Sequence, residues 1–312
     1  MEVIYTDRNK QRYCFAQHTG VGLGNFDGLH LGHMALINTL ISECRFDGLK
    51  SVIYTFTKHP GNIIRKKLFK PLITTVRKKE ELLHETNLDY VYFDEFDENY
   101  SRMRPETFVK EVLHDCLNAK LVVAGFNYTF GYKGEGDADE LRRICSKYGI
   151  RVITIPPVKI DDQIVSSSLI REYIKKGCMD QVFKLLGRHF SLTGEVKQGR
   201  KIGSRIGFPT ANIIPENYLI MPKRGVYATK TLVNDKLMPS VTNVGFNPTF
   251  GELKQISIET HILDFDENIY DKNIEVFFIK KLRNERKFNS PDELIEQVKK
   301  DIQAAKKYFS HL

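Results

Sequence analysis

The pattern of apolar and polar residues changes once along the chain, after residue 184. Before that point, short apolar runs alternate with segments in which apolar residues recur every three or four positions. The first pattern is typical of buried strands and the second of helices, so their alternation predicts a doubly wound parallel α/β sheet over residues 1–184. The expected strands are 21–26, 51–56, 90–96, 121–126 and 150–158, and the expected helices are 33–44, 78–86, 105–117 and 138–148.

In residues 185–312, apolar and polar residues alternate with a period of two instead. The alternating segments, separated by Gly, Pro and Asn, are 191–196, 225–233, 238–244, 256–263 and 274–282. Such alternation predicts antiparallel strands, and five or six short strands predict a small β-barrel. A helix is expected to close the chain, with Ser290 as its N-cap and Pro291 at its first position. Its apolar face is expected to carry Leu294, Val298 and Ile302.

Composition narrows the class of protein. The chain has 312 residues, 41% of them hydrophobic, which is more than one core usually fills. Its net charge is +8, but Lys and Arg are spread along the chain, which suits anionic small molecules better than nucleic acid. The five cysteines form no CxxC pair, so we expect neither a disulfide framework nor a zinc site, and a reducing cytoplasm fits. No leader and no apolar run of about 18 residues is present, so neither secretion nor membrane insertion is expected.

The segment GNFDGLHLGH, residues 24–33, lies where the first of these strands should give way to a helix. Ligands of parallel sheets bind at the carboxyl ends of strands. Glycines allow a tight turn close to a phosphate, and the start of the helix offers free N–H groups. His30 and His33 would then face the same anion. Zinc binding is an alternative for these histidines, but further ligands at a recognisable spacing are lacking; a purely structural turn is the other.

Four motifs in order resemble the HxGH nucleotidylyltransferases, in the variant found in bacterial FAD synthetases. In the first, the matching residues are Gly24, Phe26, Asp27, Gly28, His30, Gly32 and His33. The others are YTFTKHP with His59 and Pro60, VVAGFNYTFG with Gly125, Asn127, Phe130 and Gly131, and VSSSLIREYI with Ser166, Ser167 and Arg171. The family usually has Thr at the position of Ser168, a change that keeps the hydroxyl.

This resemblance implies that the phosphate of FMN attacks the α-phosphorus of ATP, which forms FAD and releases pyrophosphate. Such a transfer needs positioning and neutralisation of phosphate charge rather than a covalent intermediate. His30, His33 and Asn127 are the expected catalytic residues. The residues expected to bind the ATP phosphates are Gly24, Phe26, Asp27, Gly28, Gly32, Ser167 and Arg171. Capping of the turn is the alternative role of Asp27.

The segment GEVKQGRKIGSRIGFPTANI, residues 194–213, carries glycines at intervals of five, four and four. Followed by PTAN, this glycine loop resembles the riboflavin kinase family. Further matches are MPKRGVYA at 221–228, NVGFNPTF at 243–250, IETHILDFDENIYDKNIEV at 258–276 and KLRNERKFNSPDELIEQVKKDI at 281–302. The family commonly has Arg-Thr where this chain has Ser204 and Arg205, which leaves the exact ATP contact of the loop open.

The second resemblance implies phosphorylation of riboflavin to FMN, with ATP as the phosphate donor and with Mg²⁺. The glycines expected to bind the ATP phosphates are Gly199, Gly203 and Gly207. Thr210 and Asn212 offer a hydroxyl and an amide oxygen, which suit Mg²⁺.

The remaining kinase residues lie on later predicted strands. Glu259 is expected to accept the proton of the attacking hydroxyl; a cross-strand ion pair is its alternative role. Asn243 and Arg283 are expected to contact the flavin. His261, two positions after Glu259, is expected to be a packing or ribityl-side neighbour rather than a catalyst.

Taken together, the two resemblances cover nearly the whole chain and match the bifunctional bacterial riboflavin kinase/FAD synthetase family. Residues 185–312 would make FMN, and residues 1–184 would convert it to FAD. A flavin-binding regulator that has lost catalysis, with a basic face for RNA, is the alternative. The presence of the expected catalytic residues and the lack of an aromatic-basic stretch disfavour it.

Overall fold

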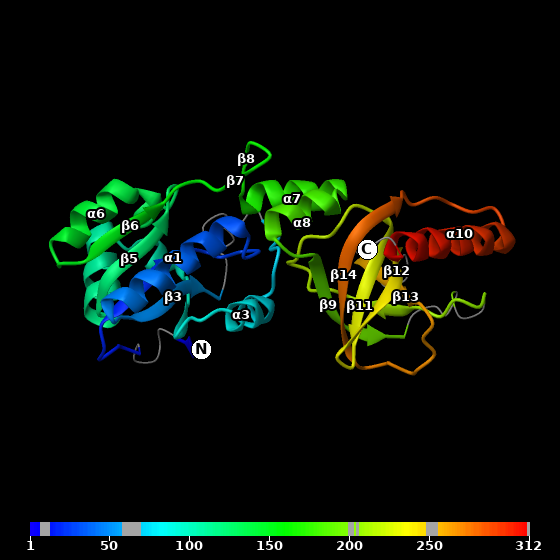
Figure 1. The fold of residues 1–312 in the computed structure, drawn as a ribbon, viewed down its shortest axis with the longest axis horizontal. Helices are drawn as coiled ribbons and strands as arrows, with labels where there is room; N and C mark the ends of the chain where they lie inside the picture. The colour runs from blue at the N-terminus through cyan, green and yellow to red at the C-terminus, as the bar shows by residue number, and fades with distance from the viewer. Residues whose placement is uncertain (7–12, 58–69, 199–202, 204–205, 248–254, 311–312) are drawn as a thin grey trace. The chain divides into compact units, whose positions relative to one another are not determined.

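The computed structural model describes residues 1–6, 13–57, 70–198, 203, 206–247 and 255–310. The chain forms two compact units, Met1–Ser167 and Ser168–Leu312 (Figure 1). Among the described residues, no helix has the length and apolar character needed to cross a membrane.

The first unit is built on a six-stranded parallel sheet, as the sequence predicts. Its strands are β1 (Glu2–Tyr5), β2 (Thr19–Leu23), β3 (Lys50–Phe56), β4 (Tyr90–Asp94), β5 (Ala119–Gly125) and β6 (Arg151–Ile155). Strand β1 was not predicted, because four residues at the sheet edge are too few to show a period. A small hairpin, β7 (Lys159–Ile160) with β8 (Gln163–Ile164), was also not predicted.

Helices cover both faces of this sheet (Figure 1). One face carries α1 (Leu31–Asp47) and α3 (Val76–His84); the other carries η1 (Phe108–Cys116) and α6 (Ala138–Ser146). Short turns at α4 (Glu98–Ser101), α5 (Pro105–Thr107) and η2 (Tyr132–Gly134) complete the unit. The single helix expected over 105–117 is instead the short α5 followed by the wider π-helix η1.

Two glycines of β2 explain how closely α1 lies on the sheet. A Cβ atom at Gly20 would come within 2.2 Å of the Cys44 sulfur, and one at Gly22 would come within 3.1 Å of Leu36 and Leu40. Because these positions lack side chains, α1 can pack directly on the β2 backbone. The helix is therefore held tightly at the strand that leads into the GNFDGLHLGH segment.

The strand order β1-β4-β3-β2-β5-β6 creates a switch point beside β2. From β2 the chain builds β3 and β4 on one side, then returns to place β5 and β6 on the other. Leu23 of β2 pairs with Ala124 of β5, so the segments that follow these strands leave the same edge of the sheet. Such a crevice is where ligands bind in open α/β sheets.

The second unit is a closed barrel with the order β10-β13-β12-β11-β14-β9. Its strands are β9 (Phe190–Lys197), β10 (Ala211–Ile213), β11 (Gly225–Val233), β12 (Lys236–Asn247), β13 (Gln255–Ile262) and β14 (Asn273–Arg283). The helices α7 (Ser167–Lys176) and α8 (Met179–Leu186) precede it, and α8 packs on β9 and β14. The period-two pattern predicted the barrel, but it missed the three-residue β10, which begins within PTAN, and the two helices.

The closing helix α10 (Pro291–Phe309) begins as predicted, because the Ser290 hydroxyl accepts a hydrogen bond from the N–H of Glu293. It packs on the outer face of the barrel against Val226, Ala228 and Val241. The opposite face of the strands carries buried hydroxyls that bond to one another, those of Thr229, Thr231, Ser240, Thr242 and Thr260. Alternation along the strands therefore separates the barrel interior from the face that meets α10.

Candidate active sites

The turn after β2 has a strained backbone. Phe26 and Leu29 have φ angles of +48° and +41°, and Gly28 has +85°. Positive φ is unfavourable for bulky residues and persists only where the surroundings impose it. Here both bulky side chains are fully buried, so the fold holds the turn in this conformation.

His30 and His33 lie together at the start of α1. Their rings stack with centroids 3.6 Å apart. His30 is the N-cap, and its Nδ1 accepts a hydrogen bond of 3.3 Å from the N–H of His33. Because Nδ1 must then hold a lone pair, the ring proton lies on Nε2, which can donate to a phosphate oxygen. One expectation needs correction: the N–H of His33 is not free for an anion.

Asp27 has contacts that favour a structural role. Its buried Oδ1 accepts hydrogen bonds from the N–H groups of Ile73 (2.9 Å) and Thr74 (3.2 Å). The Thr74 hydroxyl also accepts a hydrogen bond from the N–H of Gly28. The carboxylate therefore ties the turn to residues 73–74, just before α3.

Gly24 and Gly32 make room for rings of the motif itself. A Cβ atom at Gly24 would lie 3.1 Å from the Phe26 ring, and one at Gly32 would lie 3.2 Å from the His30 ring. These contacts give the two glycines a structural role, which is separate from their expected role beside a phosphate. The glycines allow the aromatic and histidine rings to fold back on the turn.

The other predicted residues of this site lie on two further segments. Asn127 is exposed in the turn that follows β5, beside the switch point. The Ser167 hydroxyl donates a 2.9 Å hydrogen bond to the carbonyl of Asp27, which brings the start of α7 to the turn. Arg171 is one turn further along α7. His59 and Pro60 are outside the described residues.

Sequence reasoning missed Lys79 of α3. Its side chain is buried, and its Nζ donates to the carbonyl of Asn25 (2.8 Å) and to the Thr55 hydroxyl (3.3 Å). Burial lowers the pKa of Lys79 to about 8, against the opposing effect of the Asp27 carboxylate. A signal did exist, because Lys79 occupies the helix face that Leu83 buries four positions later.

In the barrel, three predicted residues form one row across neighbouring strands. Glu259 of β13 lies opposite Asn212 of β10 on one side and opposite Asn243 of β12 on the other. Directly opposite residues of antiparallel strands share a face, with Cβ atoms about 5 Å apart. Asn243 in turn pairs with Val226, which packs beneath α10. The row therefore lies on the outer face of the barrel, where all three side chains are half-buried.

The PTAN segment is held against this row. The Asn212 amide nitrogen donates to the carbonyl of Thr210 at 3.4 Å, so the amide oxygen faces away from that bond. His261 Nδ1 donates to the carbonyl of Pro209 at 2.8 Å. His261 is therefore a packing neighbour, as expected, but it contacts PTAN. The Thr210 hydroxyl and the Asn212 amide oxygen, on the segment beside Glu259, are oxygen ligands of the kind that Mg²⁺ prefers. Waters and phosphates are the usual remaining ligands of this ion.

The described part of the glycine loop is a tight turn. The carbonyl of Gly203 accepts hydrogen bonds from the N–H groups of Ile206 and Phe208. A Cβ atom at Gly203 would come within 2.3 Å of the Phe208 carbonyl oxygen. Gly207 has φ +87° and open space around it. Gly199, Ser204 and Arg205 are outside the described residues.

Arg283 is bound to α10. Its Nε and Nη2 donate to both oxygens of Asp301 at 2.9–3.1 Å, and Asp301 is buried. Its Nη1 donates to the carbonyl of Asn284. The guanidinium expected to contact the flavin is thus also a structural link between β14 and α10.

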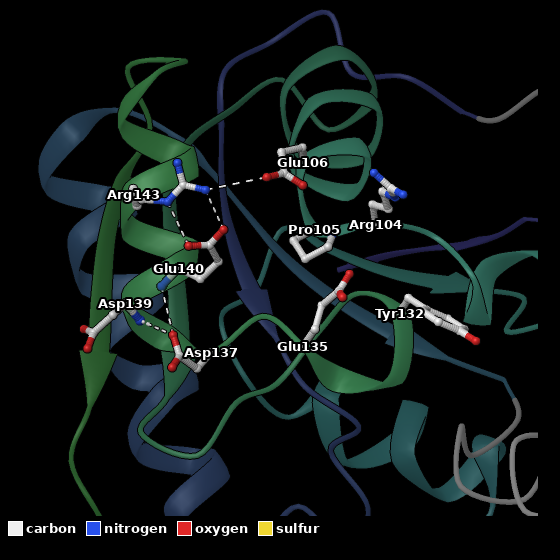
Figure 2. Close-up of a pocket in the computed structure, with 9 residues that line it drawn as sticks. All are labelled: Arg104, Pro105, Glu106, Tyr132, Glu135, Asp137, Asp139, Glu140 and Arg143. Carbon is white, nitrogen blue, oxygen red and sulfur yellow. Dashed lines mark hydrogen bonds and ion pairs between the residues drawn. The ribbon is translucent and has the colours of Figure 1, made fainter.

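A hollow on the first unit contains none of the predicted site residues (Figure 2). Its lining residues are Arg104, Pro105, Glu106, Tyr132, Glu135, Asp137, Asp139, Glu140 and Arg143. The Arg143 guanidinium pairs with Glu140 and Glu106, and Asp137 caps α6. Five carboxylates against two guanidinium groups give the lining a net negative charge, so the hollow does not resemble a phosphate site. Among the described residues, no cluster of three or more His, Cys, Asp or Glu side chains could hold a metal.

The two units define a chain that joins two flavin-related enzyme domains. Residues 14–169 match the family described as FAD synthetase, and residues 186–309 match riboflavin kinase. The chain belongs to the family of bifunctional riboflavin kinase/FMN adenylyltransferases.

Relatives that carry this name match almost end to end. The protein from Buchnera aphidicola subsp. Schizaphis graminum is 34% identical over 94% of this chain and 95% of its own. The Bacillus subtilis protein is 36% identical over 94% and 93%. A crystal structure described as a macrolide-efflux protein from Streptococcus pneumoniae is 29% identical and covers 98% of this chain and 99% of its own, with a TM-score of 0.88.

Proposed function

We propose that this chain phosphorylates riboflavin to FMN in its barrel and adenylylates FMN to FAD in its α/β unit, with ATP as the second substrate of both reactions. The observation that carries the proposal is that each family region falls on a separate fold with its own polar site. The division of activities between residues 1–184 and 185–312 is part of the proposal. So are a cytoplasmic location and the restriction to small-molecule partners, with no nucleic acid or membrane.

In the α/β unit, the bond that forms joins a phosphate oxygen of FMN to the α-phosphorus of ATP. The bond that breaks joins that phosphorus to the departing pyrophosphate. His30 donates from Nε2 to a phosphate oxygen, with His33 stacked against it. Asn127 acts from the neighbouring strand end. The phosphate site is completed by Gly24, Phe26, Asp27, Gly28, Gly32, Ser167 and Arg171, with Asp27 acting through the turn that it anchors.

In the barrel, the primary hydroxyl of riboflavin attacks the γ-phosphorus of ATP while Glu259 accepts its proton. The bond between the γ-phosphorus and the bridging oxygen breaks, and ADP leaves. Thr210 and Asn212 would hold Mg²⁺, which supplies charge neutralisation for the phosphates when bound. Asn243 and Arg283 form the flavin side, with Arg283 acting from its bond to Asp301. Gly203 and Gly207 would bind the ATP phosphates, together with Gly199, which is outside the described residues.

The test is a product analysis of the purified protein. Incubated with riboflavin and Mg-ATP, it should produce FMN and then FAD, which chromatography separates. Flavin binding without either product would favour a regulator instead.

Replacing His30 with Ala should separate the two activities. We expect FAD formation from FMN to fall by about 10²–10³-fold, because a donor to the developing phosphate charge is lost. FMN formation from riboflavin, measured in the same sample, should stay near the wild-type rate. An equal loss of both activities would contradict the assignment of one site to each unit.

A further inference from the structure

A buried lysine lies beneath the strained turn of the α/β unit. Lys79 is 7% exposed, and its ammonium group is enclosed below the segment that leads to the two histidines. Burying an ammonium group is costly unless hydrogen bonds compensate. An apolar side chain at this helix position would cost less free energy. The presence of a buried ammonium group therefore indicates that its hydrogen bonds have a role.

The ammonium group holds a single peptide of the turn. Lys79 Nζ donates to the carbonyl of Asn25 at 2.8 Å and to the Thr55 hydroxyl at 3.3 Å. The same hydroxyl donates to the Asn25 carbonyl at 3.2 Å. Two donors from different elements therefore fix the carbonyl that precedes Phe26, the first residue of the turn with positive φ.

The other side of the turn is fixed by the residues just before α3. Ile73 and Thr74 donate their N–H groups to Asp27, and Thr74 accepts from the N–H of Gly28. Residues 73–79 thus hold the turn at its start, through Asn25, and in its middle, through Asp27 and Gly28. The backbone between these anchors is the strained part, which cannot keep its conformation unsupported.

We propose that Lys79 is a positioning residue for adenylyl transfer, which fixes the peptide between Asn25 and Phe26 and thereby the direction in which His30 and His33 face the ATP phosphates. This inference rests on the proposed function of the α/β unit. Lys79 itself touches the turn and not the phosphates, so it acts on the reaction only through the geometry of the histidines.

The experiment compares Lys79→Met with Arg77→Met. Methionine fills the aliphatic volume of Lys79 but leaves the Asn25 carbonyl without its ammonium donor. Arg77 lies on the same helix, but its side chain is 81% exposed and pairs with Glu81. We expect Lys79→Met to lower FAD formation from FMN by about 10–100-fold, as misplaced catalytic groups do. Arg77→Met should change neither activity, and riboflavin phosphorylation should be unchanged in both variants.

The pH profile separates positioning from a merely structural role. With a pKa of about 8, Lys79 is charged below that pH and neutral above it, and charged donors make the stronger hydrogen bonds. Asp27 is the charged group that acts on Lys79, whereas Asn25, Thr55 and Phe93 beside it are neutral. Wild-type FAD formation should therefore fall as pH rises through about 8, and Lys79→Met should lose this dependence.

The outcomes distinguish this inference from the proposed function. A folded Lys79→Met protein that makes FAD within about threefold of the wild-type rate, far less than a misplaced group costs, overturns the inference alone. A wild-type protein that makes no FAD from FMN overturns the proposed function and the inference with it. If Lys79→Met does not fold, Thr55→Val decides, because it removes the bridging hydroxyl at nearly constant volume. Loss of FAD formation in that variant supports the inference, and the wild-type rate overturns it.

Discussion

A carboxylate on a strand can serve chemistry or sheet stability, and Glu259 lies where both roles are open. It has an amide residue opposite it on each neighbouring strand, Asn212 and Asn243, and no cationic residue at either position. Both opposite residues are amides, which can donate hydrogen bonds to a carboxylate. We propose that Glu259 acts as the base, beside the two residues expected to bind Mg²⁺ and flavin.

Glu259→Gln tests this role. The change keeps size and most hydrogen bonds but removes the ability to accept a proton, so kinase turnover at saturating substrates should fall by about 10²–10⁴-fold. A carboxylate that only supported the sheet would cost about 1 kcal/mol of stability or less and leave turnover unchanged. Steady-state kinetics and a thermal melt distinguish the two results. FAD formation from supplied FMN is the control, since its proposed residues are in the other unit.

At the scale of elements, α10 is attached to the barrel by apolar packing and by one largely buried ion pair. Asp301 is 6% exposed and Arg283 is 21% exposed, and their side chains bond at two nitrogens. Gln297 donates to the same carboxylate. Removing one partner of such a pair leaves the other charge uncompensated, which costs far more than the pair itself contributes.

Asp301→Asn should therefore destabilise the barrel unit. We expect a loss of about 2–3 kcal/mol, the low end for a broken buried pair, because part of Arg283 remains in contact with water. The measurement is the unfolding midpoint in urea, followed by circular dichroism. Glu296→Gln, which breaks the exposed pair with Lys299 on the same helix, is the control and should have little effect. Equal midpoints for the two variants would mean that apolar contacts alone hold α10.

At the scale of the whole molecule, the barrel unit contains its own proposed kinase residues. It also includes helix α8, which buries Met179, Val182, Leu185 and Leu186 and packs on β9 and β14. Each such side chain contributes about 1.5–3 kcal/mol when fully buried. A fragment that begins before residue 185 should thus be the more stable one, although the change of hydrophobic pattern lies there.

Fragments 168–312 and 186–312 test this independence. Both contain all six barrel strands and α10, so both are expected to fold and to phosphorylate riboflavin. The longer one should melt at the higher temperature, because it keeps the α8 contacts. Calorimetry and the kinase assay give the comparison. A folded 168–312 fragment without kinase activity would show that the barrel unit does not hold the whole kinase site.

Local sequence determined the kinds of element and the placing of most motifs. The spacing of apolar residues shows which side of a helix or strand is buried, and this spacing repeats within a few residues. The parallel sheet and the barrel could therefore be predicted. The Ser290 cap of α10 could be predicted from the residue types at the start of the helix. Elements of two to four residues, such as β1 and β10, are too short to show a period. They could not be found in this way.

Only the tertiary structure decided which residues meet. The order of strands places Asn127 at the same edge of the sheet as the turn that leads to the histidines, and the barrel register places Asn212, Glu259 and Asn243 in one row. The contact of Lys79 with the Asn25 carbonyl is likewise visible only in the tertiary structure. Sheet order, register and buried polar contacts depend on residues tens of positions apart in the chain, and no local pattern of burial encodes them.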